Sequence, residues 1–221
     1  MSLQTKDERS FKMKHLFVIA TGNPGKIRDF AHILGTENKE FKTLKDIGFT
    51  DDIVEDGDSF EANAIIKSSS VAKWLCEKHI EASVLADDSG LEVFALNGEP
   101  GIYSARYCGY HGNDQANNDK LMQKLEGVKD RSARYFCALS YQKAAEVDGK
   151  WTVSEPKIYE GECRGQINFA PVGDMGFGYD PLFVPDGFDR TFAQMELAEK
   201  KGISHRGNAI RAMKADLEAK G

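Results

Sequence analysis

The chain has 221 residues, of which 41% are hydrophobic and 10% aromatic, enough to bury the core of one large domain or two small lobes. This composition excludes a mainly disordered chain, and no apolar run approaches the ~20 residues that a membrane-spanning helix needs. The net charge of -6 argues against a broad nucleic-acid-binding surface. The net charge does not exclude a small cationic pocket that binds a small anion.

The first half of the chain alternates apolar strand-sized segments with helical ones. Residues 16–21 predict a buried strand closed by Gly22, and the apolar spacing of residues 26–34 predicts a helix. Ser59 is a plausible N-cap for a long helix that reaches about His79. Short strands are expected near residues 41–44, at 83–86 and at 91–96, with Asp87-Asp88-Ser89-Gly90 ending the second of them.

The second half predicts further strands and two helices. Asn113 or Asp114 opens a helix that ends at Gly127. Residues 134–141 are apolar on both faces, which favours a central strand, and Asp148-Gly149 indicates a hairpin. The remaining expected elements are strands at 151–160, 161–169 and 181–185, and a closing helix capped by Ser204. The predicted fold class is α/β with a mixed sheet and flanking helices.

The ends of the chain and its cysteines bear on the compartment. The four cysteines, Cys76, Cys108, Cys137 and Cys163, lack CxxC or zinc spacing. We therefore expect four reduced thiols in a cytoplasmic protein. Residues 1–14 are polar and lack the apolar core of a secretory signal, so they are interpreted as a natural extension or an expression scar.

The first candidate site joins the first strand to the first helix. Its residues are Thr21, Gly22, Asn23, Pro24, Gly25 and Lys26. Backbone N–H groups and the helix dipole at such a junction favour an anion, and Lys26 would add a point charge for phosphate. The glycine spacing is not that of a Walker A loop. An ordinary strand-to-helix turn with a surface lysine fits the same residues.

Carboxylates form the second candidate. Asp87 and Asp88 follow an apolar strand, and Glu55 and Asp56 precede Gly57. Mg²⁺ prefers carboxylate oxygens and substrate phosphates as ligands, so these acids could hold a magnesium ion beside a phosphate loop. A solvated acidic turn is the alternative at both places.

A third candidate lies near the C-terminus. Two glycines flank Phe177, leaving its ring on a permissive backbone where a flat ligand could stack; stacking of a base on such a ring contributes ~1–3 kcal/mol. Lys200 and Ser204-His205-Arg206 could bind phosphate or contact a base edge. A buried aromatic turn and a Ser-capped helix with surface charges are the structural alternatives.

Taken together, the order and wording of these segments resemble the inosine triphosphate pyrophosphatase family. The matching segments are Thr21-Gly22-Asn23 with Lys26, Ser59-Phe60 with Asn63-Ala64 and Lys67, residues 86–91, residues 100–106, residues 176–181 and residues 203–207. The resemblance implies an elongated mixed sheet with flanking helices, two lobes around a central cleft, and a homodimer. It also implies Mg²⁺-dependent hydrolysis of ITP, dITP or XTP to the monophosphate and pyrophosphate.

The resemblance also assigns roles to residues. Thr21, Gly22, Asn23, Pro24, Gly25 and Lys26 would hold the triphosphate, Asp88 would be the catalytic carboxylate and a metal ligand, and Ser89 would contact the substrate. Phe177, Gly178, Tyr179 and Asp180 would enclose the base and sugar; Lys200 would reach the nucleotide, and His205 and Arg206 the base. Many relatives carry two acids three and two positions before Gly57, but here Val54 takes the first position. Glu55 is therefore the expected second metal ligand, and Asp87 would support the site from behind.

Two other functions remain open at this stage. One is a pyrophosphatase for other modified nucleotides, and the other is a nucleotide-binding module without catalysis. The acids beside the expected anion argue against the second, since a pure phosphate binder gains nothing from them. Because the motifs come from both ends of the chain and must converge on one cleft, we expect residues 15–221 to form a single two-lobed domain that binds neither a membrane nor polymeric nucleic acid.

Overall fold

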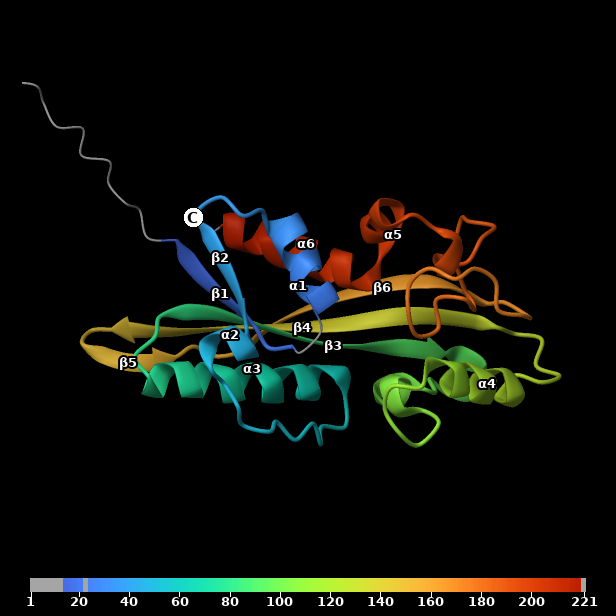
Figure 1. The fold of residues 1–221 in the computed structure, drawn as a ribbon, viewed down its shortest axis with the longest axis horizontal. Helices are drawn as coiled ribbons and strands as arrows, with labels where there is room; N and C mark the ends of the chain where they lie inside the picture. The colour runs from blue at the N-terminus through green and yellow to red at the C-terminus, as the bar shows by residue number, and fades with distance from the viewer. Residues whose placement is uncertain (1–13, 22–23, 220–221) are drawn as a thin grey trace, which may run out of the picture.

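The computed structural model describes residues 14–21 and 24–219. Within them, one seven-stranded mixed sheet runs along the molecule in the order β2-β1-β3-β4-β6-β7, with β5 paired to β4 (Figure 1). The strands are β1 His15–Ile19, β2 Lys39–Thr43, β3 Ala82–Val93, β4 Ser132–Val147, β5 Lys150–Val153, β6 Lys157–Ile167 and β7 Phe183–Pro185. β1 pairs in parallel with β2 and β3, and the other pairs are antiparallel.

Helices cover both faces of this sheet. α1 (Pro24–Leu34), α5 (Leu197–Ile203) and α6 (His205–Glu218) lie on one side, and α3 (Phe60–Glu77) and α4 (Asp114–Lys124) lie on the other (Figure 1). The short α2 (Leu44–Ile47) follows β2. No helix among the described residues has the length and hydropathy that crossing a lipid bilayer requires.

The pleat of β3 divides the core between these two layers. Leu85 packs in the cluster that contains Phe30 of α1 and Ile210 of α6. Its neighbours Val84 and Ala86 pack instead with side chains of α3. Since successive residues of a strand point to opposite faces, the next two residues, Asp87 and Asp88, must also face different layers.

Local signals in the sequence predict several helix ends and one turn correctly. Ser59 Oγ accepts from Ala62 N at 3.1 Å and caps α3, and Ser204 Oγ accepts from Gly207 N at 3.1 Å and caps α6. Asn113 caps α4. At the predicted hairpin, Asp148 and Gly149 both have positive φ, 51° and 74°, as a type I′ turn requires.

Several predicted boundaries are wrong, among them the end of the strand expected at residues 91–96, because β3 ends at Val93 and residues 94–96 form a 3₁₀ helix. Asp87-Asp88-Ser89-Gly90 does not end a strand, because β3 continues through all four residues and each pairs with β4. Gly90 is a place of close approach: a Cβ there would lie 2.5 Å from Gly101 O and Ser104 Oγ. The break expected between residues 160 and 161 is also wrong, since β6 runs unbroken from Lys157 and the gap falls before it, at residues 154–156.

Candidate active site

Asp87 faces the layer of α1 and α6 and is surrounded by donors. One carboxylate oxygen lies 3.0 Å from Lys26 Nζ, 3.1 Å from Arg206 Nε and 3.0 Å from Ser89 Oγ. Its side chain is only 1% exposed. Burial alone would raise the pKa of Asp87, but the charges of Lys26 and Arg206 hold it well below its usual range. Asp87 is therefore a buried carboxylate that positions two cations.

Arg206 has a second acidic partner on α1. Its Nη1 lies 3.5 Å from Asp29 Oδ2, and Lys201 Nζ lies 3.2 Å from the other oxygen of Asp29. Burial is the largest single effect and lowers the pKa of Arg206, but Asp87 and the other partners together outweigh it, so the net shift is upward. The guanidinium thus stays charged while almost fully buried, held between β3 and α1.

Asp88 faces the opposite layer, where α3 supplies its partners. Asn63 Nδ2 donates to Asp88 Oδ2 at 3.2 Å, and Lys67 Nζ lies 3.4 Å from Oδ1. Burial raises the pKa of Asp88, and the charge of Lys67 opposes that rise without cancelling it. A carboxylate with a raised pKa is a better proton acceptor than an ordinary aspartate.

The segment that carries Glu55 is tied to the same helix. Lys67 Nζ lies 2.6 Å from Glu55 Oε2, and Asn63 Oδ1 accepts from Gly57 N at 2.9 Å. Burial lowers the pKa of Lys67, but Asp88 and Glu55 together raise it by more, so the net shift is upward. The ammonium therefore stays charged between two carboxylates. Asn63 and Lys67 are four residues apart, one turn of α3, and face the same site.

The donor set around Lys67 fits Mg²⁺. Glu55 and Asp88 both reach a single cationic nitrogen, so their oxygens converge on a position where positive charge is favoured. Mg²⁺ in nucleotide enzymes commonly takes one or two carboxylates and completes its shell with phosphates and water. Among the described residues, no group of three or more His, Cys, Asp and Glu side chains is placed to hold a metal ion by itself. A Mg²⁺ ion between Glu55 and Asp88 would therefore need substrate oxygens to complete its ligands.

A loop after β6, residues 175–180, carries Phe177 on its surface. It is called the base loop here, after the contact with a base that is expected of it from the sequence. Phe177 is 61% exposed, whereas Tyr179 and Asp180 are 3% and 2% exposed. Asp180 accepts from Phe177 N at 2.9 Å and forms an ion pair with Lys200, whose Nζ also lies 5.2 Å from the centre of the Phe177 ring. Tyr179 donates to Ser104 O at 2.9 Å. Ser104 in turn accepts from Leu91 N of β3 at 2.9 Å, so residues 100–106 connect β3 to the base loop.

His205 lies inside the same half of the molecule. Its ring stacks on Tyr135 with centroids 4.9 Å apart and an angle of 10°, and its Nδ1 is buried without a partner in the described part of the chain. Burial, with Arg206 and Lys200 nearby, lowers the pKa of His205 well below its ordinary value. The imidazole is therefore neutral at pH 7.

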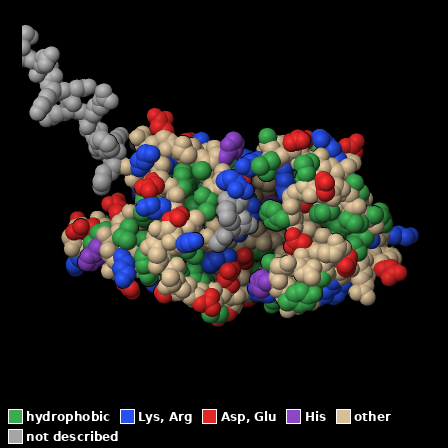
Figure 2. Space-filling model, viewed as in Figure 1, with side chains coloured by type: hydrophobic (Ala, Val, Ile, Leu, Met, Phe, Trp, Pro, Cys, Tyr) green, Lys and Arg blue, Asp and Glu red, His purple; other side chains and the backbone are tan. Residues whose placement is uncertain are grey.

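The structure brings the sequence-predicted residues together as three groups around β3. Lys26, Ser89 and Arg206 contact Asp87; Glu55 reaches Asp88 through Lys67; Phe177, Tyr179, Asp180 and Lys200 form the base loop and its support. Gly22 and Asn23 lie outside the described residues, while Thr21 and Pro24 flank them. In Figure 2 acidic and basic side chains gather around a hollow near the middle of the visible face.

Three residues that contact this site, Asn63, Lys67 and Asp29, were given no role in it from the sequence, although Asn63 and Lys67 lie in one of the matching segments. The signal for the first two is a buried amide and a buried ammonium one turn apart on an otherwise apolar helix face. Asp29 has no comparable signal, because its partners Lys201 and Arg206 are more than 170 positions away.

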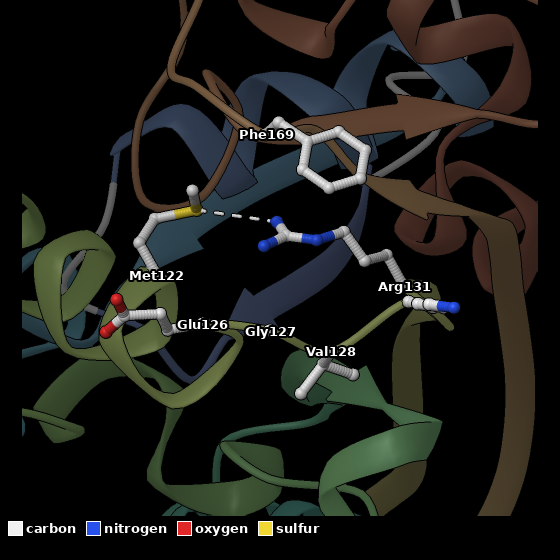
Figure 3. Close-up of a pocket in the computed structure, with 7 residues that line it drawn as sticks. Met122, Glu126, Gly127, Val128, Arg131 and Phe169 are labelled. Atoms are coloured by element: carbon white, nitrogen blue, oxygen red, sulfur yellow. Dashed lines mark hydrogen bonds between the residues drawn. The ribbon is translucent and has the colours of Figure 1, made fainter.

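A separate cavity of about 500 Å³ lies beyond the end of α4, lined by Met122, Val128, Arg131 and Phe169 among others (Figure 3). Arg131 Nη2 donates to Leu125 O at 3.0 Å, and Nη1 donates to Asn168 O at 2.9 Å. Leu125 is the C-cap of α4, where a cation is favoured by the helix dipole. Arg131 is thus explained as a structural cap, and none of the predicted site residues lines this cavity.

Known proteins are similar to this chain over nearly its full length. A model of the Ham1 family matches residues 17–216. The chain is 43% identical to the dITP/XTP pyrophosphatase of Bacillus subtilis over 204 residues, which cover 91% of this chain and 96% of that protein. The dITP/XTP pyrophosphatase of Clostridium perfringens is 43% identical over 205 residues, 91% of this chain and 97% of that protein.

Solved structures give the same result for the fold. The Ham1 protein of Staphylococcus aureus superposes with a TM-score of 0.81 at 43% identity, covering 93% of this chain and 100% of that one. A HAM1 protein from Coxiella burnetii superposes with a TM-score of 0.80 at 34% identity, covering 93% and 99%. With the family match spanning most of the sequence and the α/β fold shared, this chain belongs to the Ham1 family.

Proposed function

We propose that this protein hydrolyses the non-standard purine nucleoside triphosphates ITP, dITP and XTP to the monophosphate and pyrophosphate, which would remove them from the nucleotide pool. The observation that carries the proposal is the arrangement at Asp87-Asp88. One carboxylate holds two cations on one face of the sheet, and its neighbour on the other face is an acid with a raised pKa whose side chain is 18% exposed. The names of the relatives at 43% identity, dITP/XTP pyrophosphatase, support the substrate class.

Asp88 is the proposed catalytic base. A water oxygen attacks the α-phosphorus, the bond from that phosphorus to the bridging oxygen breaks, and pyrophosphate leaves with the bonding pair. Asp88 orients this water and accepts its proton. Asn63, bonded to the second oxygen of Asp88, fixes the direction in which the carboxylate points.

Cations of this chain balance the charge of the triphosphate. Lys26 lies in the first turn of α1, where the helix N-terminus also favours an anion, and Asp87 holds Lys26 and Arg206 in place. Thr21, Gly22, Asn23, Pro24 and Gly25 would add backbone and side-chain contacts to the phosphates, and Ser89 a further one. Glu55 and Asp88 would hold Mg²⁺; when bound, the ion neutralises charge on the phosphate oxygens.

The base would stack on Phe177 and meet donors from the other side. A 6-keto oxygen accepts hydrogen bonds, whereas the 6-amino group of adenine would set donor against donor. Arg206 remains charged, and His205 has an unpartnered buried nitrogen, so both can bond a base edge. Gly178, Tyr179, Asp180 and Lys200 support the loop on which Phe177 sits.

The test is a panel of nucleotides assayed for pyrophosphate release with and without Mg²⁺. We expect turnover of ITP, dITP and XTP, little turnover of ATP, and loss of turnover without the metal. Preference for another modified base would replace the substrate assignment, and binding without turnover would indicate a nucleotide-binding module.

A matched pair of variants tests the role of Asp88. Asp88→Asn should abolish turnover but keep ITP binding, because the amide cannot accept the proton. Glu160→Gln is the control, since Glu160 is an exposed acid that lies in register with Asp88 two strands away. Near-normal hydrolysis of ITP by Asp88→Asn would refute the assignment.

We further propose that the protein is a cytoplasmic homodimer. Free cysteines at positions 76, 108, 137 and 163 agree with a reducing compartment, and the dimer rests on the resemblance to the pyrophosphatase family. Sedimentation at micromolar concentration checks it, and a mass equal to one chain would contradict it.

A further inference from the structure

Helix α4 binds both backbone polar groups of one residue in the base loop, Gly178. Asp114 Oδ2 accepts from Gly178 N at 2.7 Å, and Asn118 Nδ2 donates to Gly178 O at 3.0 Å. Asp114 and Asn118 are four residues apart and therefore share one face of the helix. We call this pair the α4 clamp.

The clamp acts on the residue next to Phe177. Gly178 has a φ of +62° and Gly176 a φ of +85°. Because glycine adopts positive and negative φ about equally readily, the backbone on both sides of Phe177 could take other conformations. Asp180 fixes Phe177 N from inside the loop. The clamp ties this segment to α4 at Gly178, whereas Lys200 of α5 reaches it through Asp180 and the Phe177 ring.

The two members of the clamp differ in exposure. Asn118 is 8% exposed, and its Oδ1 is buried without a partner in the described part of the chain. Asp114 is exposed at the first position of α4, just after the N-cap Asn113. Removing Asp114 therefore leaves the core intact, whereas removing Asn118 also opens a small buried space.

We propose that Asp114 and Asn118 are positioning residues that hold Phe177 in its stacking position. A base stacked there is kept where its 6-position meets the donors that accept a 6-keto oxygen and reject a 6-amino group, so the clamp supports the preference for 6-keto purines over ATP. This inference rests on the proposed function. Neither residue needs to touch the substrate. Both act through Gly178, and the energy of stacking on Phe177 is available to the base only if the ring is already in place.

The first experiment measures kcat and KM for ITP and ATP in Asp114→Ala, Asn118→Ala and the wild type. The ratio of kcat/KM for ITP to that for ATP should fall about tenfold in each variant. The loss should appear in the KM for ITP, with kcat and the affinity for inorganic tripolyphosphate nearly unchanged, because the phosphate contacts are elsewhere. Gln115→Ala is the control: Gln115 bonds Asp119 across one turn on the exposed side of α4, and its variant should keep the wild-type ratio.

The second experiment asks whether the clamp works through Phe177. Phe177→Ala should lower the same ratio, and adding Asp114→Ala to it should cause no further fall, since the two changes remove the same interaction. Asp114→Asn should recover part of the ratio lost in Asp114→Ala, because the amide oxygen can still accept from Gly178 N.

The outcomes separate the inference from the function on which it rests. A wild-type enzyme without preference for ITP would overturn both. A wild-type preference that survives in Asp114→Ala and Asn118→Ala would overturn the inference alone, and so would a further fall in the ratio when Asp114→Ala is added to Phe177→Ala. If Asn118→Ala unfolds, Asp114→Ala and its Asn rescue decide the question.

Discussion

Neighbouring aspartates on β3 should give opposite phenotypes when each is changed to asparagine. Asp87→Asn removes one charge from a site where the Asp87 side chain is 1% exposed, Arg206 9% and Lys26 20%. Breaking a buried ion pair by deleting one partner costs about 3–5 kcal/mol, because the other charge stays buried. Arg206 keeps Asp29 at 3.5 Å, and the asparagine oxygen can still accept one bond, so we expect the lower end, about 3 kcal/mol.

Asp88→Asn should leave stability within about 1 kcal/mol of the wild type. Burial already disfavours the charged form of Asp88, and Lys67 retains Glu55 at 2.6 Å when the Asp88 charge is lost. The same substitution should therefore act on stability at position 87 and on catalysis at position 88.

Urea unfolding followed by the fluorescence of Trp74 and Trp151 provides the measurement. With a slope of about 2–3 kcal/mol per molar, the midpoint of Asp87→Asn should fall by about 1–1.5 M, and that of Asp88→Asn by less than about 0.5 M. Equal midpoints for the two variants, or a larger fall for Asp88→Asn, would refute the assignment of the two faces.

Two further predictions concern His205 and close packing on α6. Because burial and the charges of Arg206, Lys200 and Lys26 outweigh Asp87 and keep the pKa of His205 low, the folded state binds fewer protons than the unfolded state below about pH 6.5. Stability should fall as pH falls from 7.5 to 5.5, by about 1.4 kcal/mol from this group, and His205→Asn should remove that part of the slope in thermal melts at the two pH values; an unchanged slope would contradict it. Gly161→Ala would place a Cβ 2.1 Å from His205 O and 2.4 Å from Ala209 N. Its free energy of unfolding in urea should therefore fall by about 2–3 kcal/mol. Gly202 in α5 has open space around it, so Gly202→Ala should be neutral or stabilising by about 0.5–1 kcal/mol. Similar losses in the two glycine variants would show that the contact between β6 and α6 is not the cause.

Much of the fold follows from local sequence because the relevant signals are local. The N-caps at Ser59, Asn113 and Ser204 depend on a side chain and an amide three residues away. The turn at Asp148-Gly149 depends on two residues that tolerate positive φ. Such elements could be predicted because no distant residue is needed to explain them.

The continuation of β3 through Asp87 could not be predicted in this way. An Asp-Asp-Ser-Gly segment has the composition of a turn, and a strand there requires a charge to be buried. That burial is tolerable only because Lys26 and Arg206 arrive from positions 61 residues before and 119 residues after Asp87. The local preference of this segment for a turn is therefore overridden by a long-range electrostatic contact.

The same contact explains why the paired carboxylates can have different roles. Had β3 ended at Ala86, both aspartates would lie in a solvated turn with similar pKa values. Extending the strand sends Asp87 toward α1 and α6, where cations lower its pKa, and Asp88 toward α3, where burial raises its pKa. The pleat of one strand thus supplies a permanently charged anchor for cations and, one residue later, an acid suited to accept a proton.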